Sequence, residues 1–212
     1  YPGFQATADN PAGTNHNNNL PPIGDQAGEM LSTWTFMKRF ARSPAAIGSI
    51  VPSSRFLVTR MLESVDWQAT DHIVELGAGT GVITAAIDAQ RKPGSTFISF
   101  ERDDDMRHEL NARFPDVHTH HDAFLLPDVL TKHDLNSVDC VISGLPFANF
   151  DNQQRHALFS DIHAALRPGG VFIAFQYTRL LQPYFLSVYG RYECKRVLIN
   201  IPPALVYFCT KQ

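Results

Sequence analysis

Short apolar runs alternate with longer mixed stretches along most of the chain. The runs that predict β-strands are residues 72–76, 96–101, 117–121, 138–143 and 171–176. The stretches between or after them predict helices near residues 80–91, 103–114, 125–131, 152–166 and 180–189. Strands that alternate with helices predict an α/β domain, in which right-handed crossovers join the strands into a parallel sheet.

The last two strand-like runs follow one another with no helix between them. Residues 193–199 and 205–210 are separated by little more than Asn200-Ile201-Pro202-Pro203. Neighbouring strands with a short connection favour an antiparallel hairpin. We therefore expect residues 53–212 to form one domain with a seven-stranded, mostly parallel sheet that ends in an antiparallel C-terminal hairpin.

The N-terminal quarter of the chain lacks this alternation. Residues 1–28 are rich in Asn, Gly, Pro and Ala, which predicts a flexible leader, with or without a function of its own. Residues 29–52 combine an amphipathic helix with a constrained segment from Gly48 to Ser54, which suits either a loop over a ligand or a plain connection. Pro52-Ser53-Ser54 then signals a further helix, which we expect to end near Val65.

The amphipathic helix combines apolar and basic side chains. Trp34 and Met37 lie on one helical face flanked by Phe40, and Lys38 and Arg39 make its last turns positive. Basic residues near a helix C-terminus also suit the helix dipole. Two interpretations follow: the helix packs on the domain, or it lies in a membrane surface with its aromatic residues among the headgroups and its cations at anionic lipid.

Composition narrows the class of protein. A chain of 212 residues with 44% hydrophobic residues suits one globular domain with its own core. The net charge of −3 argues against broad nucleic-acid binding, which usually leaves a basic surface. Cys140, Cys194 and Cys209 are scattered and odd in number, which indicates reduced thiols in a cytoplasmic protein.

A glycine-rich turn follows the first predicted strand. Gly77, Gly79 and Gly81 stand where the backbone takes positive φ or approaches a ligand without a Cβ in the way. A strand, such a turn and a helix together place a ligand at the carboxyl edge of a parallel sheet. Glu75 lies inside the strand, and Glu101 ends the next strand at a spacing where an acidic side chain meets ribose hydroxyls.

This turn resembles the first motif of class I S-adenosylmethionine (SAM)-dependent methyltransferases. The resemblance implies a Rossmann-like fold, SAM as the cofactor and S-adenosylhomocysteine as its product. We expect Glu75 to hold nearby backbone or the ammonium of SAM, Glu101 to accept from the ribose hydroxyls, and Asp122 with the Ala123 amide to recognise adenine. The full set of cofactor-binding candidates is Glu75, Gly77, Gly79, Gly81, Glu101, Arg102, Asp122, Ala123 and Ser143.

Four segments, residues 44–55, 74–82, 143–147 and 200–204, together resemble the soluble, class I type of bacterial phospholipid N-methyltransferases. The resemblance extends from about Phe36 to the C-terminus. It implies stepwise methylation of phosphatidylethanolamine towards phosphatidylcholine, by an enzyme held peripherally on an anionic cytoplasmic membrane surface. Related enzymes methylate other aminolipids, such as ornithine lipids, and the oligomeric state stays open.

The residues expected to meet the acceptor end the fourth and fifth strands or precede the last. Ser143 and the carbonyls after it can accept hydrogen bonds from an amine, while Leu145 and Phe147 wall the pocket. Tyr177 is the first candidate for contact with the amine, or else it packs the sheet edge. Asn200 positions a headgroup phosphate or caps the final turn.

The alternative functions are an adenine N-methyltransferase of nucleic acid and a protein that binds SAM without catalysis. Adenine N-methyltransferases of rRNA or DNA usually carry Asn, Asp or Ser first in the motif that ends the fourth strand. Here Gly144-Leu145-Pro146-Phe147 has glycine in that position, and we expect no accessory domain after the last strand, so no nucleic-acid partner is predicted. The non-enzymatic alternative is a SAM-binding module that interacts with membranes.

A group of histidines raises the question of a metal site. His118 and His120 share one face of a predicted strand and His121 points the other way. No cysteine or carboxylate completes the set at ligand spacing, so no metal is expected.

Overall fold

The computed structural model describes residues 52–200 and 203–212. The expectations for the leader, for the amphipathic helix and for the segment before Pro52 therefore lie outside the described residues. They include five candidate membrane contacts: Trp34, Met37, Lys38, Arg39 and Phe40.

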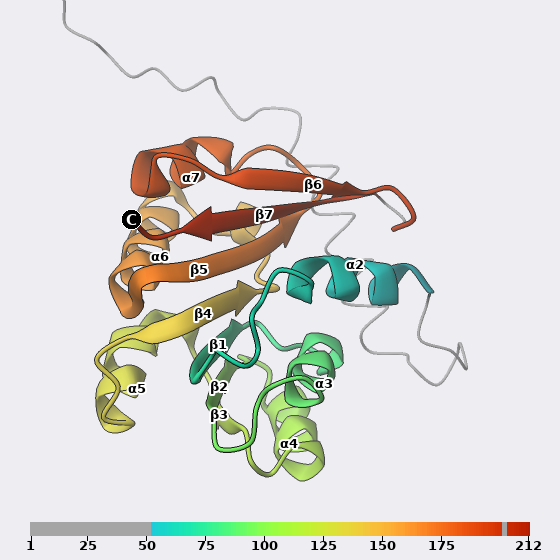
Figure 1. The fold of residues 1–212 in the computed structure, drawn as a ribbon, viewed down its shortest axis with the longest axis vertical. Helices are drawn as coiled ribbons and strands as arrows, with labels where there is room; N and C mark the ends of the chain where they lie inside the picture. Colours follow the sequence, from blue (N-terminus) through green and yellow to red (C-terminus); the bar gives the residue numbers. More distant parts are fainter. Residues whose placement is uncertain (1–51, 201–202) are drawn as a thin grey trace, which may run out of the picture.

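Within the described residues, seven strands form one sheet, and Figure 1 shows them side by side. They are β1 (His72–Leu76), β2 (Thr96–Phe100), β3 (His118–His120), β4 (Val138–Ser143), β5 (Leu166–Gln176), β6 (Glu193–Val197) and β7 (Ala204–Thr210). Their order is β3-β2-β1-β4-β5-β7-β6. The first five are parallel, and β7 runs antiparallel to both of its neighbours. The expected α/β fold with a mostly parallel sheet and a C-terminal hairpin is confirmed.

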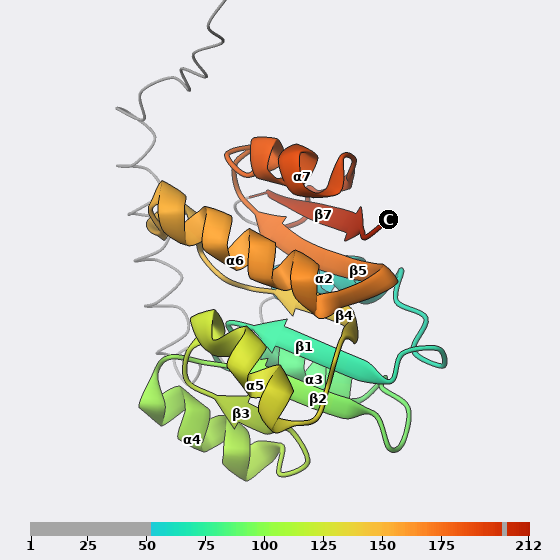
Figure 2. The same cartoon turned by 90° about the vertical axis from the view of Figure 1, so that its left-hand side faces the viewer.

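Helices cover both faces of this sheet. They are α2 (Pro52–Leu62), α3 (Val82–Asp88), α4 (Asp104–Arg113), α5 (Leu126–Lys132), α6 (Asn152–Ala165) and α7 (Gln182–Tyr189), with short 3-10 turns η2 (Ala123–Leu125) and η3 (Phe147–Asn149). Figure 2 shows α5 and α6 in front of the sheet and α2 and α3 behind it. The buried apolar residues accordingly form two clusters, one on each face.

The position of β7 decides which of the segments that follow strands lie at the same edge of the sheet. Since β7 lies between β5 and β6 and is antiparallel to both, β6 runs parallel to β5. The segment that follows β6 therefore lies at the same edge as the segments that follow β1, β4 and β5. In an open parallel sheet this carboxyl edge is where ligands bind.

Local sequence explains where several elements begin. The Asp151 carboxylate accepts from the Gln154 N–H at the start of α6, and the Gln154 side chain accepts from the Asp151 N–H, which completes a capping box. The Asp103 side chain likewise caps α4 by accepting from the N–H groups of Asp105 and Met106. These bonds satisfy amide groups that a helix start leaves without partners.

Several element boundaries differ from the sequence prediction, including those of α2, α3 and β5. Helix α2 ends at Leu62 rather than near Val65. The second difference is in α3, which starts later because Gly81, in the left-handed conformation, still belongs to the turn. Strand β5 begins at Leu166, where it already pairs with Val138, and the ladder then shifts register before pairing resumes. A bulge of this kind has no signature in apolar periodicity.

Among the helices that the structure describes, none combines the length and the apolarity that crossing a bilayer requires.

Candidate active site

The glycine turn is open beside its central glycine. Gly79 has φ of +56°, and a Cβ placed on it would meet no atom within 4 Å. The N–H groups of Gly77 and Ala78 both donate to the carbonyl of Phe100, at 2.8 and 3.0 Å, which ties the turn to the end of β2. The turn is therefore anchored to β2 on one side, and its open side can receive a ligand.

Gly81 serves a different purpose within the same turn. It has φ of +78°, and a Cβ there would lie 2.7 Å from the Leu110 side chain of α4. The glycine thus permits close packing of the turn on α4. Its predicted contact with the cofactor stays a prediction.

Glu75 lies fully buried beneath the turn. Its Oε2 atom accepts hydrogen bonds from Thr84 Oγ1 at 2.7 Å and from Ser99 Oγ at 2.8 Å. Its Oε1 atom is buried and has no partner among the described residues. Burial raises the pKa of this carboxyl to about 7. An unpartnered buried oxygen is costly, and an ammonium group laid over the turn would supply the missing donor.

Glu101 stands at the edge of the turn. Its Oε2 accepts from the Gly79 N–H at 2.6 Å, and its Oε1 accepts from the Asp103 N–H at 2.9 Å. Each carboxylate oxygen can accept more than one hydrogen bond, so both keep capacity for ribose hydroxyls. Arg102, the next candidate along the chain, is exposed.

The candidates for adenine recognition follow β3. The Asp122 Oδ1 atom accepts from the Phe124 N–H at 3.0 Å and caps η2, and Ala123 is buried at the start of that turn. Asp122 is thus the N-cap of η2. This role leaves its Oδ2 atom for an adenine amine, a contact that stays a prediction.

Ser143 ends β4 inside the protein and orders the loop that follows. Its side chain is fully buried, and its Oγ accepts from the Leu145 N–H at 3.2 Å. The Leu145 side chain packs on the turn, within 3 Å of where a Cβ of Gly77 would be. The Leu145 carbonyl accepts from Gln176 Nε2 at 3.3 Å, and its expected contact with an amine stays a prediction. Gln176 was missed by the sequence analysis, and its signal was a polar residue that ends an apolar strand.

Phe147 is enclosed by aromatic side chains of the core. It is fully buried and contacts the rings of Phe150, Phe159 and Phe172. Its ring therefore anchors the loop from inside the protein, rather than lining a surface pocket as the sequence analysis expected.

Buried Arg155 of α6 holds the same loop. Its Nε donates to the Phe147 carbonyl at 2.9 Å, and its Nη1 donates to Asn152 Oδ1 at 3.1 Å. The guanidinium also lies over the ring of Tyr184. Sequence alone gave no signal for this role, because a single arginine in a helix usually marks an exposed face.

Tyr177 and Asn200 meet at the carboxyl edge. A hydrogen bond joins their side chains, although one follows β5 and the other follows β6. Burial raises the pKa of the Tyr177 hydroxyl and this bond opposes the rise, so the phenol is neutral at physiological pH. Asn200 is buried, and the Tyr177 ring packs edge-on against Phe175. The pair offers one polar group that both donates and accepts.

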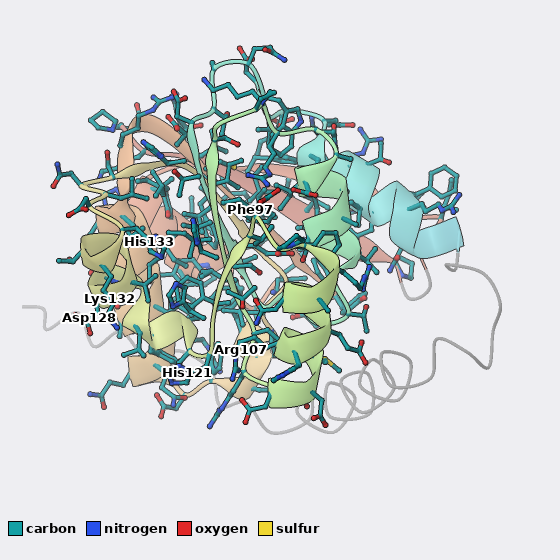
Figure 3. All side chains as sticks on the ribbon, turned by 90° about the horizontal axis from the view of Figure 1, so that it is seen from below. Phe97, Arg107, His121, Asp128, Lys132 and His133 are labelled. Carbon is teal, nitrogen blue, oxygen red and sulfur yellow. The ribbon has the colours of Figure 1, made fainter. Side chains whose placement is uncertain are left out.

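His118 and His120 lie on one face of β3, as predicted, and a third histidine at the end of α5 joins them. The rings of His118 and His120 both pack against His133 at the end of α5, and Nε2 of His120 lies 3.1 Å from Nε2 of His133. Figure 3 shows His121 well apart from His133. Within the described part of the chain, no group of three or more possible ligands is arranged to hold a metal ion.

Known proteins with a similar sequence or fold include methyltransferases. Residues 73–170 match the family described as "Methyltransferase domain". The fold resembles that of the O-methyltransferase from Bacillus cereus in complex with SAH, with a TM-score of 0.60 and 14% identity, covering 91% of this chain and 93% of that one. It also resembles a TehB-like SAM-dependent methyltransferase from Corynebacterium glutamicum, with a TM-score of 0.58 and 18% identity, covering 86% and 99%.

An ornithine lipid N-methyltransferase from Singulisphaera acidiphila is 32% identical over 190 residues, which cover 85% of this chain and 96% of that protein. This relative, together with the matched domain and the fold, defines a class I SAM-dependent methyltransferase, with SAM as its cofactor. The chain belongs to the family of lipid N-methyltransferases.

Proposed function

We propose that the protein transfers the methyl group of SAM to the amine of an aminolipid headgroup, with ornithine lipid as the first candidate acceptor. The observation that carries the proposal is the 32% identity, over nearly the whole relative, to an ornithine lipid N-methyltransferase. The Tyr177–Asn200 pair supports it, because it adds a neutral polar group at the edge where the glycine turn opens.

SAM supplies an electrophilic methyl group when it is bound. The protein's own residues bind the cofactor and orient it. Gly79 would give the aminoacyl part room, Glu75 would pair with its ammonium, and Glu101 would accept from the ribose hydroxyls. Alignment of the two reactants supplies much of the rate in such a transfer.

On the acceptor side, the Tyr177 hydroxyl accepts a hydrogen bond from an N–H of the amine. This bond turns the nitrogen lone pair towards the methyl donor. Asn200 holds that hydroxyl in place. Ser143 and Gln176 act through Leu145, because Ser143 accepts from its N–H and Gln176 donates to its carbonyl. An alkylammonium must lose a proton before attack, and water at the exposed edge can take it.

The test is transfer of labelled methyl groups from SAM into vesicles that contain ornithine lipid or phosphatidylethanolamine, resolved by thin-layer chromatography. We expect label in ornithine lipid, and loss of that label in a Glu75→Ala variant. SAM binding without label in either lipid would contradict the proposal.

Phosphatidylethanolamine is the second candidate acceptor. The four sequence segments that resemble bacterial phospholipid N-methyltransferases favour it. Label in its mono-, di- or trimethylated forms, with none in ornithine lipid, would reverse the order of the two candidates.

A lipid acceptor also calls for contact with a membrane. We propose a peripheral location on the cytoplasmic face, where the expected helix at residues 29–42 binds anionic lipid. Binding of the chain to anionic vesicles, and its loss on Trp34→Ala with Lys38→Ala, would test this contact.

A further inference from the structure

Three exposed apolar side chains gather where α2 begins and β6 ends. Phe56 is 49% exposed, Leu198 72% and Ile199 61%. The described part of the chain has five exposed large apolar side chains, and these three lie together between α2 and the turn after β6. We call Phe56, Leu198 and Ile199 the α2–β6 patch. Single exposed apolar residues are ordinary, whereas a group of them marks an interaction surface.

A groove runs through this patch. Its volume is about 340 Å³, and its lining includes Phe56, Thr59, Arg60, Arg196, Leu198 and Ile199. Lys195 of β6 pairs with Glu63 at 3.1 Å, just past the end of α2, and so ties the two sides together. This ion pair joins β6 to α2 beside the patch, and Leu198 and Ile199 lie in the turn that directly follows β6.

Basic side chains lie at the patch. Arg60 and Arg196 line the groove together with Glu63, and Lys195 lies beside it. Arg60 pairs with Glu63, and Lys195 pairs with Glu63 and Glu193, so these three cations exceed the two carboxylates by one. Arg196 is exposed. An apolar centre with a basic rim complements an anionic lipid surface, where the apolar groups enter the headgroup region and the cations meet phosphate.

The patch also adjoins the candidate active site. Ile199 directly precedes Asn200, whose side chain bonds to Tyr177. Figure 1 shows the start of α2 and the end of β6 on the side towards which the arrows of β4 and β5 point. An acceptor anchored in a bilayer can reach only an edge that faces the bilayer. Contact through this patch would turn the carboxyl edge towards the lipid.

We propose that the α2–β6 patch is a membrane-docking surface for anionic phospholipid bilayers, which presents the Tyr177–Asn200 edge to a lipid headgroup. The proposal rests on the proposed lipid acceptor and adds a second contact, within the folded domain, to the one expected at residues 29–42. The bound partner is a bilayer, and no single lipid species is required.

The experiment is sedimentation of the full chain with vesicles of phosphatidylglycerol and phosphatidylcholine. The test variant carries Leu198→Gln and Ile199→Gln together. The control is Leu186→Gln, which removes another exposed leucine, 51% exposed, from α7 on the other face of the sheet. We expect the partition coefficient of the test variant to fall about tenfold or more and that of the control to stay within about twofold. Arg196→Gln should lower the partition coefficient at low salt and have less effect at high salt.

A second measurement does not depend on loss of function. In Leu198→Trp, the added indole should shift its emission to shorter wavelength when anionic vesicles are added, beyond the change in the unmodified chain. No added shift, together with unchanged partition of the double variant, would overturn the proposal.

Two other occupants of the patch have their own signatures. If a second copy covers it, the protein sediments as a dimer without lipid and the double variant as a monomer. If residues from the N-terminal 51 cover it, the double variant loses thermal stability while its vesicle binding is unchanged. Either result overturns the docking proposal.

Failure of docking and failure of the proposed function are distinguishable. Vesicle binding is measured without SAM or acceptor, so it reports on docking alone. Methyl transfer to a short-chain, water-soluble aminolipid reports on the acceptor alone, and the double variant should keep it.

Discussion

Glu75 is the residue whose chemistry depends most on what binds beside it. Its carboxyl is fully buried, two hydroxyls bond one oxygen, and the other oxygen has no partner among the described residues. Without a ligand, burial favours the protonated form and raises the pKa to about 7. A ligand ammonium next to Oε1 would favour the ionised form instead.

This raised pKa predicts how the stability of the ligand-free protein depends on pH. The folded state keeps a proton on Glu75 that the unfolded chain releases above pH 4.5, so the stabilisation is complete at low pH and is lost as pH rises through about 7. The loss amounts to about 3 kcal/mol. Glu75→Gln should remove it, which urea unfolding between pH 4.5 and 8 would measure. Parallel pH curves for the two proteins would contradict the assignment.

The Tyr177–Asn200 pair predicts coupled effects on catalysis. Tyr177→Phe keeps the ring packed on Phe175 and removes the hydroxyl, while Asn200→Ala removes its partner. Each should lower kcat by about tenfold to a hundredfold, because the acceptor loses its alignment. The double variant should be little worse than either single variant. Steady-state kinetics would measure kcat, and titration with SAM would show an affinity within about twofold of the unmodified protein. Additive losses of kcat would contradict the coupling between Tyr177 and Asn200.

At the scale of elements, the β1–α3 turn and the β4–η3 loop support one another. The turn is bonded to the end of β2, and the side chain of Leu145 packs over Gly77. The loop is in turn bonded by Gln176 of β5 and by Arg155 of α6. Cofactor and acceptor sides of the site therefore share one set of supports.

The two glycines of the turn should respond differently to alanine. Gly79→Ala has room for its Cβ and should lower the unfolding free energy by only about 1–2 kcal/mol for the left-handed backbone. It should weaken SAM binding at least about tenfold, because the Cβ fills the open side of the turn. Calorimetric titration with SAM and urea unfolding would measure the two effects.

Gly81→Ala should show the opposite balance. The backbone cost is similar, and the Leu110 side chain must also move from 2.7 Å, so unfolding free energy should fall by about 2–4 kcal/mol. SAM affinity of the fraction that stays folded should change less than in Gly79→Ala. Equal losses of affinity in both variants would show that Gly81 contacts the cofactor after all.

At the scale of the molecule, one sheet carries the whole site. The ends of β1, β2, β3, β4 and β5 supply the cofactor candidates and Tyr177, while β6 supplies Asn200, and helix layers on both faces hold the strands in register. A ligand that bridges several strand ends should thus stabilise the domain as a unit.

Saturation with SAM should therefore raise the melting temperature in a single cooperative transition. At a SAM concentration a hundred times its Kd, the added stability is about 2.7 kcal/mol, which corresponds to a rise of roughly 5–11 °C for a domain of this size. Differential scanning calorimetry would measure it. A rise confined to one of two separate transitions would show that the site belongs to only part of the domain.

The sequence alone determined the order of the elements and the position of the cofactor turn. Period and turn chemistry are local properties, so strand β4 was predicted at its observed bounds and the glycine turn was located directly. The family resemblance added the lipid acceptor as an expectation. Element ends were less accurate where packing decides them, as at the bulge in β5.

Only the tertiary structure decided which side chains share a surface. The place of β7 between β5 and β6 brings Asn200 to Tyr177, and it puts Leu198 and Ile199 beside α2. The unpartnered oxygen of Glu75 likewise depends on three elements that pack around it. Apolar periodicity states which face of an element is buried, whereas strand order and register, which set these contacts, come from long-range pairing that no local pattern encodes.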